Sequence, residues 1–430
     1  MINIEELIIK NASFLERPDD LAPLIEKIKD KKIVMLGESS HGTHEFYEWR
    51  RLISQELIQN HGFSFIAVEG DWPPSMVLNR FIKQGDSTIS KTLKSFNRWP
   101  TWMWANTEII KLGHWLQDHN LNTSLKQKVG FHGLDVYSLF DSMDMVVKEL
   151  MTIDPEIADK ARNLYTCFDP YQRNEKRYAK SLFQIPEGCK KATLKALDET
   201  LKIRLKDLTK YENLFDAQQN ARIVKNAEAY YSTMIHGDED SWNVRDRHMM
   251  ETLNHLLRYY GHNSKAIVWA HNTHIGDHRA TDMVSEGLVN LGGIAREQWG
   301  HQLALVGFST YEGDVMASRA WDGKAEVMRV PPGRDKTYEK FFHNACETLN
   351  RNTLLMWLEP FSENSPLTKV FGHRAIGVVY NPEFERGNYV PTALSQRYDA
   401  FIFVDRSNAI IPIPQEFATN EIPETWPRGQ

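Results

Sequence analysis

The stretch KKIVMLGESSHGTHEFYEWRR, from Lys31 to Arg51, decides the fold class. Residues 33–36 form a continuous apolar run, which is the pattern of a strand buried on both faces. Apolar side chains then recur every three or four residues from Phe46 to Leu57, which predicts a helix. The turn between them, GESSHG, carries an acid, two hydroxyls and an imidazole. We therefore expect a strand–turn–helix unit of an α/β protein, with functional side chains in its turn.

Short apolar runs of the same kind recur along the chain and predict further buried strands. They are FSFIAV (63–68), KVGFHGL (128–134), KAIVWA (265–270), LALVGF (303–308), TLLMWL (353–358), AIGVVY (375–380) and AFIFVD (400–405). Helical patterns separate the first few runs, which is typical of an α/β fold. The sequence thus predicts a mostly parallel sheet flanked by helices.

The middle of the chain has a different character. Residues 139–260 are charged and periodic, and they contain few β-branched residues. Within them, KATLKALDETLKIRLKDL places leucines on one stripe, which indicates an amphipathic helix. We predict a large all-helical insertion at 139–260, interrupting a discontinuous α/β catalytic body made of 1–138 and 261–430. The proline-containing tail from Pro412 onward is expected to be an extended surface segment.

Bulk composition excludes several functional classes. The chain of 430 residues has a net charge of −6 and a pI near 6.3. These values argue against binding to nucleic acid or to an anionic membrane. No apolar run approaches the ~18 residues of a membrane span, and the N-terminus has no signal-peptide core. Cys167, Cys189 and Cys346 lack metal-type spacing and suit a reducing compartment. We expect a cytoplasmic protein; the sequence does not indicate an oligomeric state.

Acids or imidazoles directly follow four of the predicted strands. They are Glu38 and His41, Glu69 and Asp71, Asp135, and His271 and His274. Each of these side chains has a structural alternative, such as capping a helix or bonding the loop backbone. Because the carboxyl ends of parallel strands meet at one rim, however, four such sets predict a shared site.

Three kinds of chemistry fit this set of residues. A serine hydrolase elbow, Gly-x-Ser-x-Gly, fails on spacing because His41 stands where the second glycine is needed. A metal site could draw on His271, His274 and the glutamates, but the helical His-Glu-x-x-His pattern is absent. The third is hydrolysis by a general base without a metal or other cofactor, and it uses the most residues.

In the third chemistry, an imidazole takes a proton from water. An ordinary histidine has a pKa near ~6.5 and can do so at neutral pH. His41 would be this base, and a carboxylate, Glu38 or Glu69, would orient it. Arg50 on the following helix or a second histidine would hold the substrate carbonyl and its developing oxyanion.

The same residues resemble those of a known family. GESSHG, an arginine nine residues after its histidine, VEGDWP and WAHNTH are similar to segments of the erythromycin esterase family, which includes members named for succinoglycan biosynthesis. RWPTWMWANTE, GFHGLDVYS, SWNVRDRHM and RAIGVVYNPEFERGNY also look like family segments. The resemblance therefore extends through most of the chain.

This resemblance implies hydrolysis of a carboxylic ester, with a macrolide lactone as the preferred substrate and antibiotic resistance as the consequence. The position of His41 matches the family's water-activating base, and Glu38, Arg50, Glu69, His271 and His274 match residues of the same site. Trp72, Trp102 and Trp104 are expected to form a wall for a large ligand, with Asp135 beside it. Their alternative role is to glue the helical insertion to the body. The alternative function is a metal- or ligand-binding family member with a different substrate or no turnover.

Overall fold

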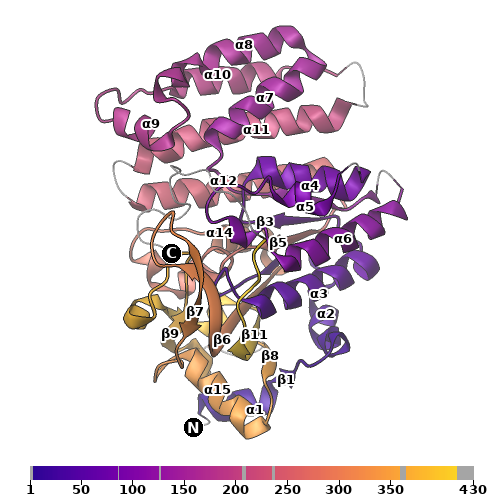
Figure 1. Ribbon diagram of the computed structural model, residues 1–430. Coiled ribbons are helices and arrows are strands. Elements are labelled where there is room, and N and C mark those ends of the chain that lie inside the picture. Colours follow the sequence, from indigo (N-terminus) through magenta and orange to yellow (C-terminus); the bar gives the residue numbers. More distant parts are fainter. Residues whose placement is uncertain are drawn as a thin grey trace.

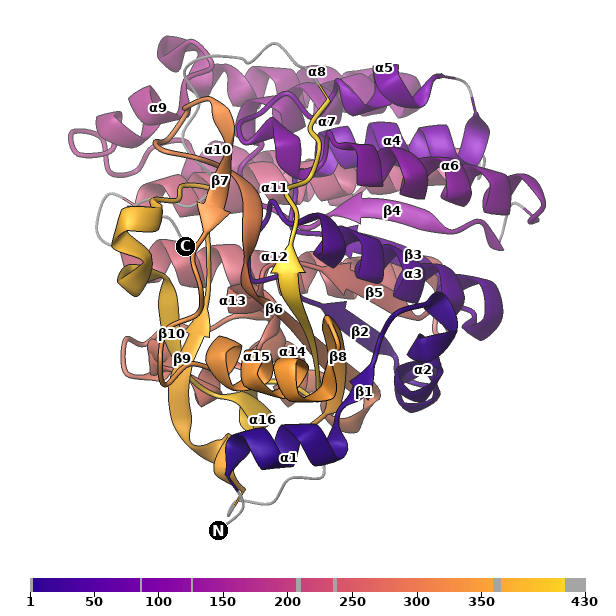
Figure 2. The same ribbon diagram turned by 60° about the horizontal axis from the view of Figure 1, so that its bottom comes forward.

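The computed structural model describes residues 3–85, 87–124, 127–205, 210–234, 238–358 and 365–413. Its centre is a nine-stranded sheet in the order β1-β8-β11-β6-β2-β5-β3-β4, with β7 paired to β6 and a separate β10-β9 ribbon (Figures 1 and 2). The strands are β1 (Ser13–Phe14), β2 (Ile33–Leu36), β3 (Phe65–Val68), β4 (Gly130–Gly133), β5 (Ala266–Trp269), β6 (Leu303–Ser318), β7 (Ala325–Val330), β8 (Thr353–Trp357), β9 (Val370–Arg374), β10 (Tyr389–Ala393) and β11 (Ala400–Ser407). The run from β11 through β6, β2, β5 and β3 to β4 is parallel. The remaining strands pair antiparallel with their neighbours: β8 with β11, β1 with β8, and β7 with β6. The predicted fold class is confirmed.

Helices cover both faces of this sheet. In the first part of the chain they are α1 (Ile4–Asn11), α2 (Ala22–Ile28), α3 (His44–His61), α4 (Trp72–Gln84), α5 (Ile89–Leu93) and α6 (Thr107–Leu121). In the last part they are α13 (Asn272–Ile275), α14 (Leu291–Trp299), α15 (Tyr338–Leu349) and α16 (Leu394–Arg397). Side chains of each central strand alternate between two cores: Val34 and Leu36 of β2 pack with α2, α3 and α6, whereas Ile33 and Met35 pack with α1, α14 and α15. Burial on both faces explains why these strands read as unbroken apolar runs.

Between β4 and β5 the described chain is helical. The helices are α7 (Leu139–Ile153), α8 (Pro155–Tyr165), α9 (Glu175–Ser181), α10 (Lys190–Leu201), α11 (Tyr211–Met234) and α12 (Asp238–Tyr260). Helices α7 to α11 share a core of their own and form a layer at the top of Figure 1. Helix α12 instead packs Met249, Leu253 and Leu256 into a sheet core. The last helix of the expected insertion therefore belongs, by its packing, with the sheet.

Two sequence expectations need correction. The run 375–380 was expected to be a strand, but it makes only single bridges, Ile376 to Ser40 and Val379 to Ser318, and lies against the GESSHG turn. Cysteine usage in the sequence suits a reducing compartment, whereas in the structure Cys167 and Cys189 form a disulfide and Cys346 is free. Cysteine usage therefore gives no support to a reducing compartment, and a cytoplasmic location stays a prediction. The expected tail from residue 414 lies outside the described residues.

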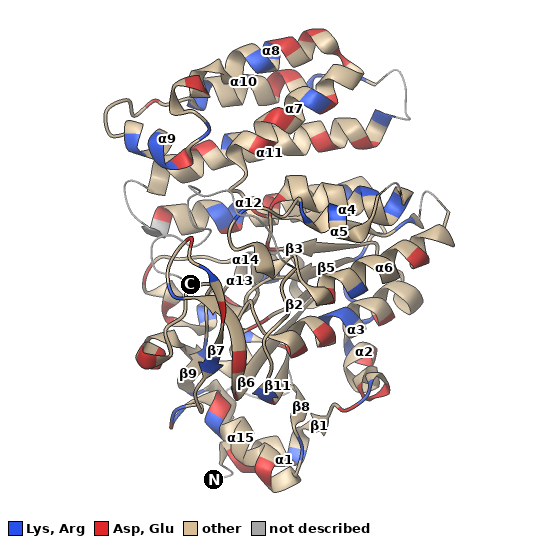
Figure 3. Cartoon of the chain, viewed as in Figure 1, with Lys and Arg blue, Asp and Glu red and all other residues tan. Residues whose placement is uncertain are grey.

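Charged residues of both signs alternate along the chain. In the cartoon of Figure 3, positions of acidic and basic residues are interspersed along the helices, in agreement with the composition. Within the described ranges, no helix combines the length and the apolarity that crossing a bilayer requires.

Candidate active site

Four neighbouring strands deliver the site residues to one rim. The sheet runs β2-β5-β3-β4 through its parallel part, and the acids and imidazoles follow the carboxyl ends of these strands. Glu38 and His41 follow β2, His271 and His274 follow β5, and Glu69 follows β3. All five side chains are buried. Residues spread over more than half of the chain therefore converge because parallel strands end together.

Glu38 links the predicted base to an arginine. The Nδ1 atom of His41 lies 3.0 Å from Glu38 Oε1, and Arg50 Nη2 donates to Glu38 Oε2 at 2.6 Å. A carboxylate only accepts hydrogen bonds, so the proton of the neutral imidazole sits on Nδ1 and Nε2 keeps its lone pair. The guanidinium of Arg50 lies over the rings of Tyr47 and Trp269, 4.4 and 4.8 Å from their centroids. In this conformation Arg50 therefore anchors Glu38.

His271 has the opposite arrangement of donor and acceptor. It is the N-cap of α13, and its Nδ1 accepts from the backbone N–H of Thr273 at 3.3 Å, with the Thr273 hydroxyl 2.9 Å away. Because Nδ1 accepts, the proton of the neutral ring lies on Nε2. That Nε2 is buried and makes no hydrogen bond of normal geometry with the described residues. The ring centroids of His271 and His41 are 4.9 Å apart.

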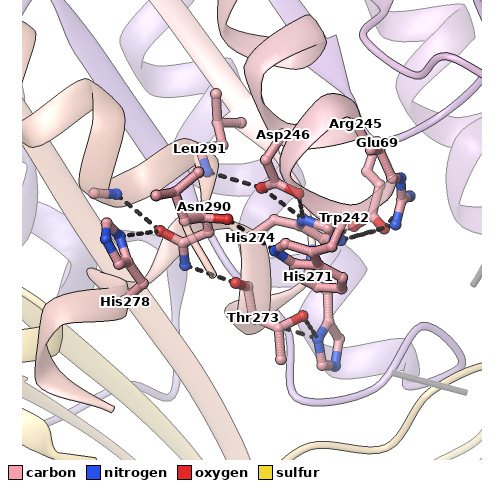
Figure 4. Close-up of polar contacts among 12 residues, drawn as sticks. Glu69, Trp242, Arg245, Asp246, His271, Thr273, His274, His278, Asn290 and Leu291 are labelled. Carbon is pink, nitrogen blue, oxygen red and sulfur yellow. Dashed lines mark hydrogen bonds and ion pairs between the residues drawn. The ribbon is translucent and has the colours of Figure 1, made fainter. Parts of the chain in front are cut away.

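Glu69 fixes the backbone of His271. Its Oε2 accepts the His271 backbone N–H at 2.7 Å, and its Oε1 lies 2.8 Å from Arg245 Nη2 and 3.2 Å from His274 Nε2. Arg245 also donates to both carboxylate oxygens of Asp135, at 3.0 and 2.7 Å. Figure 4 shows Arg245 and His274 converging on Glu69. Glu69 is therefore an anchoring carboxylate, placed beside the histidine pair rather than on His41.

His274 is enclosed by charged partners. Its Nδ1 lies 2.9 and 3.0 Å from the two oxygens of Asp246, and the Trp242 ring stacks on it at 4.6 Å with an interplanar angle of 8°. Both ring nitrogens thus face protein groups. A direct catalytic role for His274 remains a prediction, and the contacts favour a positioning role.

The electrostatics of these groups follow from burial and from their partners. Burial strongly lowers the pKa of His271 and the nearby His41 lowers it further, whereas Glu69 and, to a smaller extent, the backbone of Ser39 oppose this. For His274, burial lowers the pKa, but Asp246 and Glu69 outweigh this effect and raise the pKa to about 9. For Glu69, burial raises the pKa, but His274 and Arg245 outweigh it and hold the pKa well below the usual range. The site therefore combines a neutral imidazole, an imidazolium and a carboxylate near neutral pH.

Two further residues of the site, Arg245 and Asp246, were missed from the sequence. They lie on α12, where charged side chains are expected to face solvent. Their spacing held a signal, because residues 242, 245, 246, 249, 250 and 253 share one helical face, and Met249, Met250 and Leu253 are apolar. Two charged residues on the apolar stripe of a helix indicate a buried polar site.

The expected tryptophan wall is packed into the protein interior. Trp72 stacks on His132 and donates from Nε1 to Asp216 at 2.8 Å, and Trp104 donates from Nε1 to the Glu69 carbonyl at 3.0 Å. Trp102 is buried in the same core as Trp104. Trp72 joins α11 of the helical insertion to the sheet, which is the alternative role considered for these residues, whereas Trp102 and Trp104 pack within the body. Contact with a substrate is an untested expectation for these tryptophans and for Asp135, whose carboxylate is occupied by Arg245.

The geometry also bears on the metal alternative. Within the parts of the chain that the structure describes, no group of three or more histidine, cysteine, aspartate or glutamate side chains is arranged to hold a metal ion. Glu38 and Glu69 are occupied by arginines, and Nδ1 of His41 and of His271 meets Glu38 and Thr273, respectively. The donor set therefore fits an organised pair of imidazoles better than a metal centre.

The fold and the site place the chain among α/β proteins whose polar site lies at the carboxyl ends of parallel strands. Residues 58–407 match the sequence model of the family described as erythromycin esterase, and the chain belongs to this family. The matched range contains Glu69, Arg245 and the histidines after β5, whereas Glu38, His41 and Arg50 precede it. The family resemblance recognised in the sequence is thereby confirmed.

Individual relatives agree with this assignment. An Escherichia coli protein named erythromycin esterase type II is 25% identical over 323 residues, covering 70% of this chain and 74% of that protein. The crystal structure of a succinoglycan biosynthesis protein superposes with a TM-score of 0.79 at 20% identity, covering 95% of this chain and 97% of the other. A mutant of erythromycin esterase EreC in its open conformation gives a TM-score of 0.64 at 17% identity, covering 92% and 95%. The two structures show the shared fold.

Proposed function

We propose that the protein is a carboxylic ester hydrolase in which His41 activates water without a metal ion, and that its substrate is a macrolide lactone. The observation that carries this proposal is the pairing of two buried imidazoles with complementary protonation. His41 presents a lone pair at Nε2, and His271, 4.9 Å away between ring centroids, presents an N–H at Nε2. One ring can accept a proton while the other donates a hydrogen bond.

The two rings divide the chemistry of ester hydrolysis between them. His41 Nε2 takes a proton from water as the water oxygen bonds to the ester carbon, and the Glu38 carboxylate stabilises the resulting imidazolium. The carbonyl oxygen becomes an oxyanion and accepts a hydrogen bond from His271 Nε2–H. When the tetrahedral intermediate collapses, the bond between carbon and the alcohol oxygen breaks. The leaving alcohol oxygen then takes the proton from His41, and a lactone yields one opened chain that carries both a carboxylic acid and an alcohol.

A neutral His271 suits the role of hydrogen-bond donor. Its lowered pKa keeps the ring neutral in the pH range where a histidine base works, so the pair does not hold two adjacent cations. The buried N–H has no protein hydrogen bond of normal geometry to break when charge develops on the oxyanion. Membership of the erythromycin esterase family supports the choice of a macrolide lactone, in which the broken ester bond lies within a ring.

A chelation experiment tests this proposal against the alternative of a binding protein. The full-length protein is dialysed exhaustively against a chelator, its metal content is measured by elemental analysis, and hydrolysis of macrolides and simple esters is followed. We expect hydrolysis to survive in metal-free protein. Stoichiometric bound metal with no hydrolysis of any ester would instead support a metal- or ligand-binding member of the family.

A further inference from the structure

We propose that Asp246 is a positioning residue of this site. Asp246 holds His274 as an imidazolium beside Glu69, and this imidazolium fixes the Glu69 carboxylate, which in turn orients His271. This inference rests on the proposed hydrolytic function for its effect on turnover. Its structural part, the charge state of His274, stands independently of any substrate.

Asp246 contacts two elements of the rim at once. Its two oxygens lie 2.9 and 3.0 Å from His274 Nδ1, and Oδ1 also accepts the backbone N–H of Leu291, the first residue of α14, at 2.8 Å. Figure 4 shows Asp246 placed between His274 and Leu291. The side chain is completely buried. Burial raises the pKa of Asp246, and His274, which contacts both of its oxygens, is the group that most strongly opposes this and stabilises the charged carboxylate.

Charge balance across the cluster favours an imidazolium at His274. Three buried carboxylates, those of Glu69, Asp135 and Asp246, meet one permanent cation, Arg245. A neutral His274 would leave two negative charges uncompensated, whereas an imidazolium leaves one. The flat stacking of Trp242 on the His274 ring also suits a cation.

One contact on its own favours a neutral ring, because Arg245 Nη1 lies 3.0 Å from His274 Nε2 and arginine only donates. Glu69 Oε1, however, lies 3.2 Å from the same Nε2 and offers an acceptor to a protonated ring. In the imidazolium form Nε2–H donates to Glu69 in place of accepting from Arg245 Nη1. Arg245 keeps its other bonds, from Nη2 to Glu69 and from Nε and Nη2 to Asp135.

The charge at His274 reaches the reacting pair through Glu69. Oε1 of Glu69 is held by the two cations, which leaves Oε2 to accept the backbone N–H of His271 at 2.7 Å. That bond fixes the position of the His271 backbone and so of its ring, which lies next to the ring of His41. Replacing Asp246 by a neutral group would loosen this chain of contacts without removing any atom from the reacting pair. A displacement of the order of 1 Å is enough to lower turnover.

The test separates this role from simple capping of α14. Asp246→Asn keeps an oxygen that can accept from Leu291 N–H but removes the charge, and Asp246→Glu restores the charge in a longer side chain. Asp216→Asn is the matched control, because Asp216 is an equally buried carboxylate that binds Trp72 and Arg80 in a different cluster. In each protein, ¹⁵N NMR of selectively labelled histidine reports the protonation of His274, and ester hydrolysis reports kcat and KM.

We expect wild-type His274 to carry protons on both nitrogens at pH 7. Asp246→Asn should lower its titration midpoint by about one pH unit or more and lower kcat about 10- to 100-fold, with KM nearly unchanged. Asp246→Glu should recover part of the titration midpoint of His274 and part of kcat. Asp216→Asn should leave the midpoint and kcat at their wild-type values. A wild-type His274 that is neutral at pH 7 would overturn the proposal even if Asp246→Asn does not fold, as would an unchanged kcat in a folded Asp246→Asn protein. If no ester is hydrolysed by the wild type, the proposed function fails while the NMR result still decides the charge state.

Discussion

The rings of His41 and His271 lie 4.9 Å apart between centroids at an angle of 40°, although 230 positions separate them in the chain. Each is held by a glutamate that a buried arginine anchors: Glu38 holds the His41 side chain, and Glu69 holds the His271 backbone. The two anchors fix opposite hydrogen-bonding characters, an acceptor at His41 Nε2 and a donor at His271 Nε2. This complementarity is the physical basis of the proposed hydrolysis.

Replacing the base should abolish most turnover and keep the fold. His41→Gln preserves a polar side chain that can meet Glu38 but cannot take a proton at neutral pH, so kcat should fall ~10²–10⁴-fold. His61→Gln, at the far end of α3, the helix that follows the turn of His41, is the matched control and should retain wild-type rates. Steady-state kinetics on a hydrolysed ester measures both, and a His41→Gln rate above half the wild-type value would remove His41 from the mechanism.

Replacing the donor should affect the transition state more than substrate binding. His271→Asn keeps an N-cap able to accept from Thr273 N–H, but it removes the N–H at the position of Nε2. Loss of one oxyanion donor typically lowers kcat ~10²–10³-fold, and KM should change little. His278→Asn, a buried histidine that bonds Asn290 nearby, serves as the control (Figure 4). Equal kcat values for the two variants would show that His271 does not stabilise the oxyanion.

The rim site could be foreseen because its signal is local in the sequence. Each strand is a short apolar run, and each functional group follows its strand within a few residues, as Glu38 and Glu69 do. Parallel strands then bring these groups together by geometry alone. The order of the strands, which puts β5 between β2 and β3, depends on long-range pairing and could not be deduced from the runs.

Other parts could not be foreseen because their local pattern has two physical interpretations. A tryptophan-rich segment suits either a ligand wall or a core, and for Trp102 and Trp104 tertiary packing decided for the core. The apolar run 375–380 has the composition of a strand but pairs with the GESSHG turn only at Ile376. Arg245 and Asp246 resemble solvated helix residues until their position on a buried helical face is considered.

The charge on His274 should appear in the pH dependence of stability. Its pKa in the folded protein, about 9, exceeds the ~6.5 of an unfolded histidine, so its contribution is full below pH ~6.5 and is lost as the pH rises through 9. The difference of about 2.5 units sets an upper limit of ~3 kcal/mol on this contribution. Urea unfolding between pH 7 and 9.5 measures it, in a range where the lowered pKa values of His271 and His132 do not contribute. We expect the decline to be much smaller in Asp246→Asn, and an identical decline would contradict the assignment.

The packed tryptophans should contribute to stability rather than to substrate affinity. Trp72→Phe removes the hydrogen bond from Nε1 to the buried Asp216, so the free energy of unfolding should decrease by ~1–3 kcal/mol. KM should stay the same, because the indole is enclosed by His132 and Phe215. Trp115→Phe, at a partly exposed tryptophan, is the control for the loss of an indole. A KM several times higher in Trp72→Phe, with unchanged stability, would support contact between this tryptophan and the substrate.

The central claim is that this protein adds water to a macrolide lactone by means of His41. The most direct measurement is mass spectrometry of a macrolide incubated with metal-free wild-type protein and, in parallel, with His41→Gln. The account predicts a product heavier by one water with the wild type and unchanged macrolide with the variant. Unchanged macrolide with both proteins would contradict the proposed substrate, and conversion by both would contradict the proposed base.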